Sequence, residues 1–417
     1  MGRPDQGDPE EAAGYSRRSL LGSGAVLAGT ALLGGTVGHA AGARAAQPAA
    51  PAGPRLALHG AATEPFFGAH QSGILTRQQA HGSFVGLNLR PGQGSTQVRA
   101  MLQLLSDDAA RLTSGGAPLG ALEDDIAALP GRLTVTFGFG AGLFDAIGKP
   151  DALPPAVAKL PAFATDRLRP AWGQTDLVLQ ICSEEPVALS FAQRRLVRNA
   201  APFASVAWVQ SGFVNAAGTE APGTTPRNLM GMRDGTANET DPAQAAAVVW
   251  STDPRYPWLV GGSHLVIRRM AIDMTAWDDV TVQGKELAFG RRLDTGAPLT
   301  GSREHDLVDR TAVDERGFPV IAPNAHAALA QARTASERIM RRAYNYDVGL
   351  SPDGEPDVGL IFVAYQRDVA DAFVPIQQRL AASDALNTWA THIGSASYAV
   401  PPGARRGSYV GAGLLES

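Results

Sequence analysis

The 417-residue chain is poor in cysteine and in charge. Its single cysteine, Cys182, excludes an internal disulfide framework and a zinc site built on cysteines. Lysine and arginine number 36 against 40 aspartate and glutamate, which gives a formal net charge of −4. This balance removes the broad electrostatic attraction to nucleic acid, so we expect no nucleic-acid partner.

Long apolar runs and the common hydrolase signatures are missing as well. The apolar N-terminal run ends near Leu33 and is too short for a membrane span of about 20 residues, so we expect no stable membrane insertion. The chain has no His-Glu-x-x-His motif and no Gly-x-Ser-x-Gly elbow, which argues against zinc and serine hydrolases. Gly138-Phe139-Gly140 lacks the remainder of a dinucleotide-binding fingerprint.

Residues 1–45 have the order of an export signal. Ser16-Arg17-Arg18 precedes the apolar run, and Ala43-Arg44-Ala45 offers a small-x-small cleavage site. This order resembles a twin-arginine signal and predicts a periplasmic or extracellular mature chain that begins near Ala46. The alternative is a basic tail before a membrane anchor. Because twin-arginine carriers move folded proteins, the signal favours a protein that carries a cofactor.

The remaining length predicts two domains, at residues 46–225 and 226–417. Apolar runs with strand character alternate with segments of helical spacing, and hairpin-like pairs stand between them. This pattern predicts an α+β fold with two antiparallel sheets rather than a doubly wound parallel sheet. The expected strands are 81–90, 132–140, 176–182, 264–270, 339–346 and 359–365, and the expected helices are 98–112, 185–199 and 374–386.

The stretch Gly231-Met-Arg-Asp-Gly-Thr-Ala-Asn-Glu239 is the most informative one. Asp234 stands beside a glycine on a tight turn, where the backbone can approach a flat ligand closely. Thr236 and Asn238 add short polar groups that can stabilise the turn. Taken alone, such a sequence is more often an ordinary surface turn, so its meaning depends on the rest of the chain.

His326 and the pair Arg341-Arg342 are the other candidates for a site. His326 lies among small, apolar neighbours, a setting that suits an axial haem ligand but also a hydrogen-bonded core histidine. The two arginines fall in an expected strand, so alternation sends them to opposite faces. One can point into a buried site, where it should meet carboxylates or an anionic ligand, while the other faces water. The alternative is a solvated basic edge.

Together these segments resemble the dye-decolorizing peroxidase family over essentially the whole mature chain. Gly231-Met-Arg-Asp-Gly235 fits that family's Gly-x-x-Asp-Gly signature. Further similar blocks follow in order: Thr134–Gly140 with Leu143-Phe144, Gly262–Arg269, Gly290–Arg292 with Asp294–Leu299, Arg341–Tyr346, Ala364–Asp368, Phe373–Gln377 and Pro401–Leu414. The most similar branch is the exported bacterial one that includes the deferrochelatase/peroxidase proteins.

The resemblance implies two ferredoxin-like α+β domains, of the dimeric α+β barrel type, with one haem b in the C-terminal domain. It implies His326 as the proximal iron ligand, Asp234 as the distal acid–base residue and Arg341 as the distal arginine, with Arg342 as its rival. It implies that the backbone of Gly235, Thr236 and Ala237 borders the edge of the haem. It further implies that Arg333 and Arg268 pair with the haem propionates.

The implied activity is a haem peroxidase that reduces hydrogen peroxide and oxidises dyes, phenolics or similar reductants in one-electron steps through a ferryl intermediate. The alternative is a deferrochelatase that binds haem and releases its iron; Asp234 and Arg341 favour the peroxidase, because haem handling needs neither. Trp389, Tyr398 and Trp277 are candidates for relaying electrons to bulky substrates, although such aromatics are more often core residues. The physiological reductant, a homo-oligomeric state and the carboxylate that supports His326 stay open.

Overall fold

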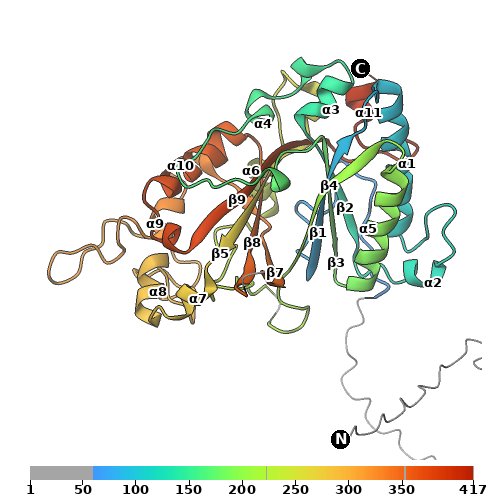
Figure 1. The fold of residues 1–417 in the computed structure, drawn as a ribbon. Helices are drawn as coiled ribbons and strands as arrows, with labels where there is room; N and C mark the ends of the chain where they lie inside the picture. Colours follow the sequence, from blue (N-terminus) through green and yellow to red (C-terminus); the bar gives the residue numbers. More distant parts are fainter. Residues whose placement is uncertain (1–59, 222, 352–353, 417) are drawn as a thin grey trace, which may run out of the picture. The chain divides into compact units, whose positions relative to one another are not determined.

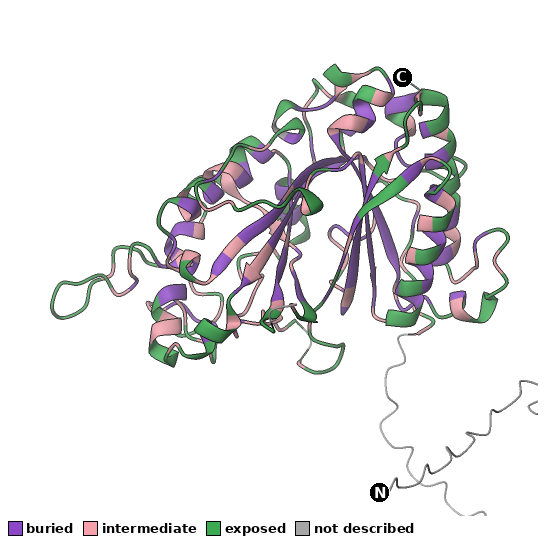
Figure 2. Ribbon diagram, viewed as in Figure 1, coloured by how far each residue is buried: buried purple, intermediate pink, exposed green. Residues whose placement is uncertain are grey.

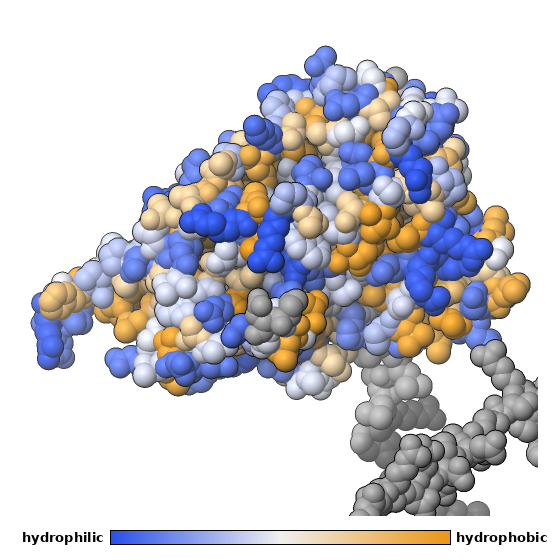
Figure 3. Space-filling model, in the orientation of Figure 1, coloured by the Kyte–Doolittle hydropathy of each residue, from blue (hydrophilic) through white to orange (hydrophobic). Residues whose placement is uncertain are grey.

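The computed structural model describes residues 60–221, 223–351 and 354–416 (Figure 1). The export signal expected in residues 1–45 lies outside these ranges. Among the described residues, no helix is both long and apolar enough to cross a membrane. The face drawn in Figure 3 carries hydrophilic and hydrophobic side chains interspersed over most elements.

The N-terminal half forms a four-stranded antiparallel sheet in the order β2-β3-β1-β4. Two long helices cover its outer face, because their apolar positions recur with helical spacing and are buried against the strands. The elements of this half are β1 His81–Leu89, α1 Ser95–Thr113, α2 Asp124–Ala127, β2 Thr134–Phe139, α3 Ala141–Ala146, η1 Pro150–Ala152, α4 Pro155–Ala158, η2 Pro170–Trp172, β3 Leu177–Ser183, α5 Pro186–Ala200 and β4 Ala204–Phe213.

The C-terminal half repeats this topology, with strand order β9-β5-β8-β7 and a short strand β6 paired to β8. The connection from β5 to β6 is long, and its α8–α9 part protrudes from the body (Figure 1). The elements are α6 Pro242–Val249, η3 Pro257–Leu259, β5 Ser263–Ile272, α7 Met274–Asp278, α8 Val282–Phe289, α9 His326–Ala330, η4 Ala335–Glu337, β6 Met340–Arg341, β7 Tyr344–Leu350, β8 Pro356–Gln366, η5 Val369–Phe373, α10 Val374–Ser383, η6 Ala385–Thr388, β9 Ala390–Val400 and α11 Ala412–Leu415.

The two half-sheets join into one nine-stranded sheet that closes on itself. Single pairings, Phe139 with Ala399 and Phe213 with Asn345, connect the halves, and β5 pairs with both β8 and β9. Bulky side chains from both halves fill the interior, so the barrel is a packed core. Figure 2 shows the strands buried and the outer faces of the helices exposed.

The expected α+β fold of two ferredoxin-like units is confirmed, with two corrections to the expected elements. The strand expected over 339–346 is divided into β6 and β7, although both pair with β8 in one register. The helix expected over 374–386 ends at Ser383, because Asp384 turns to φ −61° and ψ 127° and begins the next short helix.

Candidate active site

His326 begins helix α9, and its imidazole binds a carboxylate distant in sequence. Nδ1 lies 2.6 Å from Oδ2 of Asp384, which is 58 residues further along the chain. The Asp384 side chain is almost fully buried, whereas 27% of the His326 side chain is exposed. Nε2 has no hydrogen-bond partner within the described part of the chain, so it is available as a ligand nitrogen.

Asp384 is the supporting carboxylate that the sequence left open. Its Oδ1 accepts the backbone N–H of Leu386 at 2.9 Å and thereby caps helix η6. The next residue, Ala385, donates its backbone N–H to the carbonyl of Asn324, two residues before His326. These contacts hold the carboxylate against the imidazole. A cap-forming Asp inside an expected helix is the signal that points to this position.

The turn formed by residues 231–239, called the Asp234 turn below, has the geometry that its glycines predict. Gly231 and Gly235 have φ of +88° and +123°, where side chains are disfavoured. The Asp234 amide donates to the carbonyl of Pro226 at 2.8 Å, and the Asn238 amide donates to the carbonyl of Gly235 at 2.8 Å. Backbone hydrogen bonds therefore fix the turn at Asp234 and just after it.

The structure brings Asp234 and Arg341 together. Arg341 Nη1 lies 3.2 Å from Asp234 Oδ1, and both side chains are mostly buried. Within the described residues Oδ1 of Asp234 accepts no aligned hydrogen bond, so the contact with Arg341 is one of charge. Asn238 fixes the arginine, because its side-chain amide binds both the backbone N–H and the carbonyl of Arg341.

Arg342 points away from Asp234 into the barrel, as strand alternation predicts. Its guanidinium donates to the carbonyl of Thr76 at 2.5 Å and to the side-chain oxygen of Gln79. The expectation that one of the two arginines faces water is wrong, because closure of the barrel buries Arg342 and the Asp234 turn covers most of Arg341. The more buried arginine binds neutral oxygens where a carboxylate was expected.

The other expected cofactor residues lie in different surroundings. Arg268 is fully buried in an ion pair with Asp166 of the N-terminal half and also donates to Ser395 at 3.3 Å. Arg333 is exposed, and its backbone N–H donates to Glu337 at 3.0 Å. Ala237 is exposed on the turn, and the Thr236 hydroxyl donates to Glu304 at 3.0 Å. The Arg268 guanidinium therefore faces Asp166 and Ser395 rather than the Asp234–Arg341 pair.

One apolar cluster contacts His326 and includes near neighbours in sequence of Asp234, Asp384 and Arg341. The cluster has as its buried members Met230, Met232, Ile272, Trp277, Ala288, Phe289, Leu360 and Leu386. Met232 lies two residues before Asp234, Leu386 lies two after Asp384, and the Phe289 ring packs edge-on at 6.2 Å from the His326 ring. Ala343, two residues after Arg341, packs against the same cluster. An apolar wall with a free imidazole nitrogen fits a planar macrocycle.

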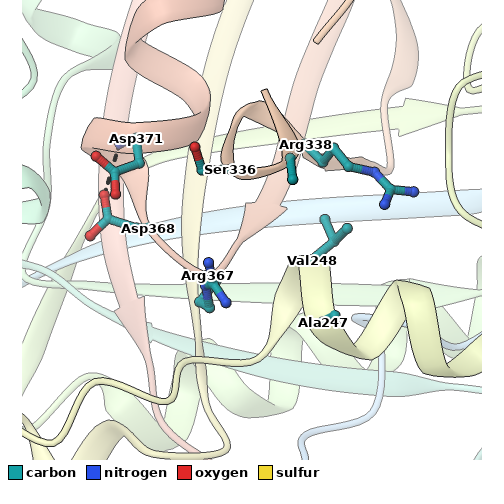
Figure 4. A pocket seen from close by; sticks show the side chains of 8 residues that line it. Ala247, Val248, Ser336, Arg338, Arg367, Asp368 and Asp371 are labelled. Atoms are coloured by element: carbon teal, nitrogen blue, oxygen red, sulfur yellow. Dashed lines mark hydrogen bonds between the residues drawn. The ribbon is translucent and has the colours of Figure 1, made fainter. Parts of the chain in front are cut away.

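A small pocket seen in Figure 4 is separate from these residues. It lies between α6 and the segments around η4 and η5, and its lining includes Arg338 and Arg367 opposite Asp368 and Asp371. Arg338 forms an ion pair with Glu239, which follows Asn238 in the turn. The pocket is therefore linked to the end of the Asp234 turn through Arg338, and its lining does not include the Asp234 carboxylate.

The aromatic residues expected as electron relays divide into two groups. Trp277 is buried and packs edge-on against Phe289 at 5.7 Å and against Trp389 at 5.0 Å between ring centroids. Trp389 is only partly buried. Tyr398 lies inside the barrel, where its hydroxyl bonds to Thr175 at 2.8 Å. Only the two tryptophans therefore lie on a path of ring contacts that begins at His326.

Comparison with known proteins agrees with this geometry. Residues 71–214 match the family model "Dyp-type peroxidase, N-terminal" and residues 225–405 match "Dyp-type peroxidase, C-terminal". These matches agree with the two ferredoxin-like halves of the structure and place the chain in the class of α+β haem peroxidases. The chain belongs to the Dyp-type peroxidase family and is an enzyme of this class.

Two curated relatives and two solved structures illustrate the likeness. A dye-decolorizing peroxidase from Thermobifida fusca is 40% identical, over 97% of this chain and 98% of its own. A deferrochelatase from Escherichia coli is 35% identical, over 84% of this chain and 87% of its own. A DyP-type peroxidase structure from Cellulomonas bogoriensis has a TM-score of 0.84 and 43% identity, covering 87% of this chain and all of that one. Ferric DtpA from Streptomyces lividans has a TM-score of 0.82 and 36% identity, with the same coverage.

Proposed function

We propose that each chain binds one haem b, with Nε2 of His326 as the proximal ligand. The support is the donor set: Nδ1 is engaged by Asp384, which orients the ring and raises the basicity of the free nitrogen. The apolar cluster beside Phe289 offers the surface that a macrocycle needs. Bound haem would supply the iron that reduces hydrogen peroxide and withdraws electrons one at a time from a reductant.

Asp234 and Arg341 would handle the proton and the charge of the peroxide reaction. The observation that carries the proposal is the buried Oδ1 of Asp234, which accepts no aligned hydrogen bond from the described residues and lies 3.2 Å from Arg341. This oxygen would take a proton from one oxygen of hydrogen peroxide and return it to the other, so that water leaves. The Arg341 guanidinium would stabilise the negative charge that develops as the O–O bond breaks.

Bulky reductants such as dyes would be oxidised at the protein surface. A chain of ring contacts supports this: His326 to Phe289 at 6.2 Å, Phe289 to Trp277 at 5.7 Å, and Trp277 to Trp389 at 5.0 Å. Trp389 is the partly exposed end of that chain. Small phenolic reductants would not need it. Export by the twin-arginine route, which is supported by Arg17-Arg18 and Ala43-Arg44-Ala45, would bring the enzyme to such substrates.

Stopped-flow absorbance of the haem-loaded enzyme mixed with hydrogen peroxide tests this assignment. Asp234→Ala and Arg341→Ala should each lower the bimolecular rate constant by about a hundredfold, the usual effect of losing general acid–base or electrostatic assistance. Asp371→Asn, which changes an exposed carboxylate outside the site, is the matched control. Unchanged rates in both active-site variants would overturn the roles of Asp234 and Arg341.

Iron release from haem is the second candidate, because relatives 34–35% identical to this chain are named deferrochelatases. The same His326 and apolar cluster would bind the substrate, but Asp234 and Arg341 would have no required role. Haem incubated with the enzyme and an iron chelator, without peroxide, distinguishes the two functions. Accumulation of metal-free porphyrin at equal rates in the wild type and in Asp234→Ala would favour this candidate.

A further inference from the structure

A carboxylate on the protruding α8–α9 connection binds both sides of the Asp234 turn. Glu304 Oε1 accepts the hydroxyl of Thr236 at 3.0 Å, and Glu304 Oε2 lies 3.6 Å from Nε of Arg233. Only 16% of the Glu304 side chain is exposed. Arg233 immediately precedes Asp234, and Thr236 follows it by two residues. One side chain therefore holds the turn on either side of the proposed acid–base residue.

The backbone around Glu304 is itself held in place. Nη1 of Arg291 donates to the carbonyl of Glu304 at 2.9 Å and to the carbonyl of Gly296 at 2.7 Å. His305 adds a second contact to the turn, because its Nδ1 lies 3.3 Å from the carbonyl of Thr236. Arg291, which follows helix α8, thus holds the backbone of Glu304. The consecutive residues Glu304 and His305 both contact Thr236.

The Asp234 carboxylate has little else to hold it. Among the described residues its one charged contact is with Arg341, and Asn238 anchors the turn to that arginine. We propose that Glu304 is a positioning residue, which holds the Thr236 side of the turn so that the Asp234 carboxylate stays in contact with the Arg341 guanidinium. This inference rests on the proposed role of Asp234.

Four variants and one control separate the hydrogen bond between Thr236 and Glu304 from the charge contact between Glu304 and Arg233. Glu304→Ala removes both contacts, and Thr236→Val removes only the hydroxyl. Glu304→Gln keeps an acceptor for that hydroxyl, and Thr236→Ser keeps the hydroxyl itself. The matched control is Glu220→Ala, because Glu220 lies 3.3 Å from Arg233 but does not contact Thr236.

The first measurement is amide hydrogen exchange of the folded protein, followed by mass spectrometry over residues 226–241. The backbone amides of Asp234 and Asn238, which bond to the carbonyls of Pro226 and Gly235, report on the rigidity of the turn. We expect Glu304→Ala and Thr236→Val to speed their exchange by about tenfold, a loss typical of one buried hydrogen bond. Glu304→Gln, Thr236→Ser and Glu220→Ala should exchange like the wild type.

The second measurement is the rate of reaction with hydrogen peroxide, with fluoride affinity of the ferric enzyme as a spectroscopic readout. Glu304→Ala and Thr236→Val should lose about tenfold in both, while their conservative partners stay within about threefold of wild type. If Glu304→Ala matches Glu220→Ala in exchange and in fluoride affinity, the inference is overturned. If Asp234→Ala itself leaves the peroxide rate unchanged, the proposed role of Asp234 fails, while the exchange data still decide whether Glu304 holds the turn.

Discussion

The side-chain amide of Asn238 binds the backbone of Arg341 from both directions. Its Nδ2 donates to the Arg341 carbonyl at 2.6 Å, and its Oδ1 accepts the Arg341 N–H at 2.8 Å. On the other edge of β6, Arg341 pairs with Ala364 of β8. The arginine is thus held like a residue in the middle of a sheet, although β6 has only two residues.

Replacing Asn238 should loosen this arrangement. In Asn238→Ala the backbone of Arg341 loses both partners, so we expect a loss of about 1–3 kcal/mol in stability and about a tenfold slower reaction with peroxide. Asn238→Asp keeps the acceptor but cannot donate to the carbonyl, and should be intermediate. Thermal unfolding and stopped-flow rates measure the two effects. A rate unaffected in both variants would show that Asn238 does not position Arg341.

Removing the carboxylate behind His326 should weaken haem binding. Asp384→Ala leaves Nδ1 without its buried acceptor, and we expect haem affinity to fall by about 10–100-fold. Titration of the apoprotein with haem, followed at the Soret band, gives the dissociation constant. Asp241→Ala also removes a helix-capping carboxylate, that of α6, and serves as the control. Equal affinities in both variants would contradict the role of Asp384.

Oxidation of bulky dyes should depend on Trp389, whereas oxidation of small phenols should not. Trp389→Phe removes the indole at the exposed end of the ring contacts, and we expect kcat/KM for an anthraquinone dye to fall by about tenfold. The phenol reaction of the same variant should stay unchanged. Trp258→Phe alters an indole that packs against Phe144, remote from the apolar cluster, and controls for general effects. Parallel losses with both substrates would argue against a relay.

Arg268 should matter for stability and not for haem. Its fully buried guanidinium is paired with Asp166, so Asp166→Ala leaves an uncompensated charge and should cost about 3–5 kcal/mol. The double variant Asp166→Ala with Arg268→Met should recover part of that loss. Urea unfolding measures both. A normal stability together with weakened haem binding would instead support the propionate role expected for Arg268.

Two buried histidines should make the fold sensitive to mild acid. Burial lowers the pKa of His264, and burial together with the charge of Arg268 lowers the pKa of His392 to about 3. The histidine pKa in the unfolded chain is about 6.5. Between about pH 3 and this pKa the two histidines are protonated in the unfolded chain but neutral in the folded one, so the free energy of unfolding rises with pH across this window.

Urea unfolding of the wild type and of His392→Gln between pH 4 and pH 7 isolates the contribution of His392. The variant should lose less stability on acidification, by up to about 1.4 kcal/mol for each pH unit below 6. Burial raises the pKa values of Asp108 and Asp176, which acts in the opposite direction but equally in both proteins. Parallel stability curves would show that His392 does not stay neutral in the folded state.

Local patterns in the chain predict most of the fold. The strands of both halves, the long helices α1 and α5 and the tight turn around Asp234 follow from apolar periodicity and from glycine placement, which act over a few residues. Strand alternation also predicts that Arg341 and Arg342 separate. It does not predict that both are covered, because that depends on barrel closure by pairings such as Phe213 with Asn345.

The partners of the site residues come from distant segments, and no local pattern encodes them. Asp384 lies 58 residues from His326, Asn238 lies 103 from Arg341, and Glu304 lies 68 from Thr236. The sequence by itself determined the family, the α+β class and the residues expected to carry the chemistry. Only the tertiary structure decided which side chain supports each of them, because such contacts depend on where the long α8–α9 connection, the turn that holds Asn238 and the start of η6 pack in the fold.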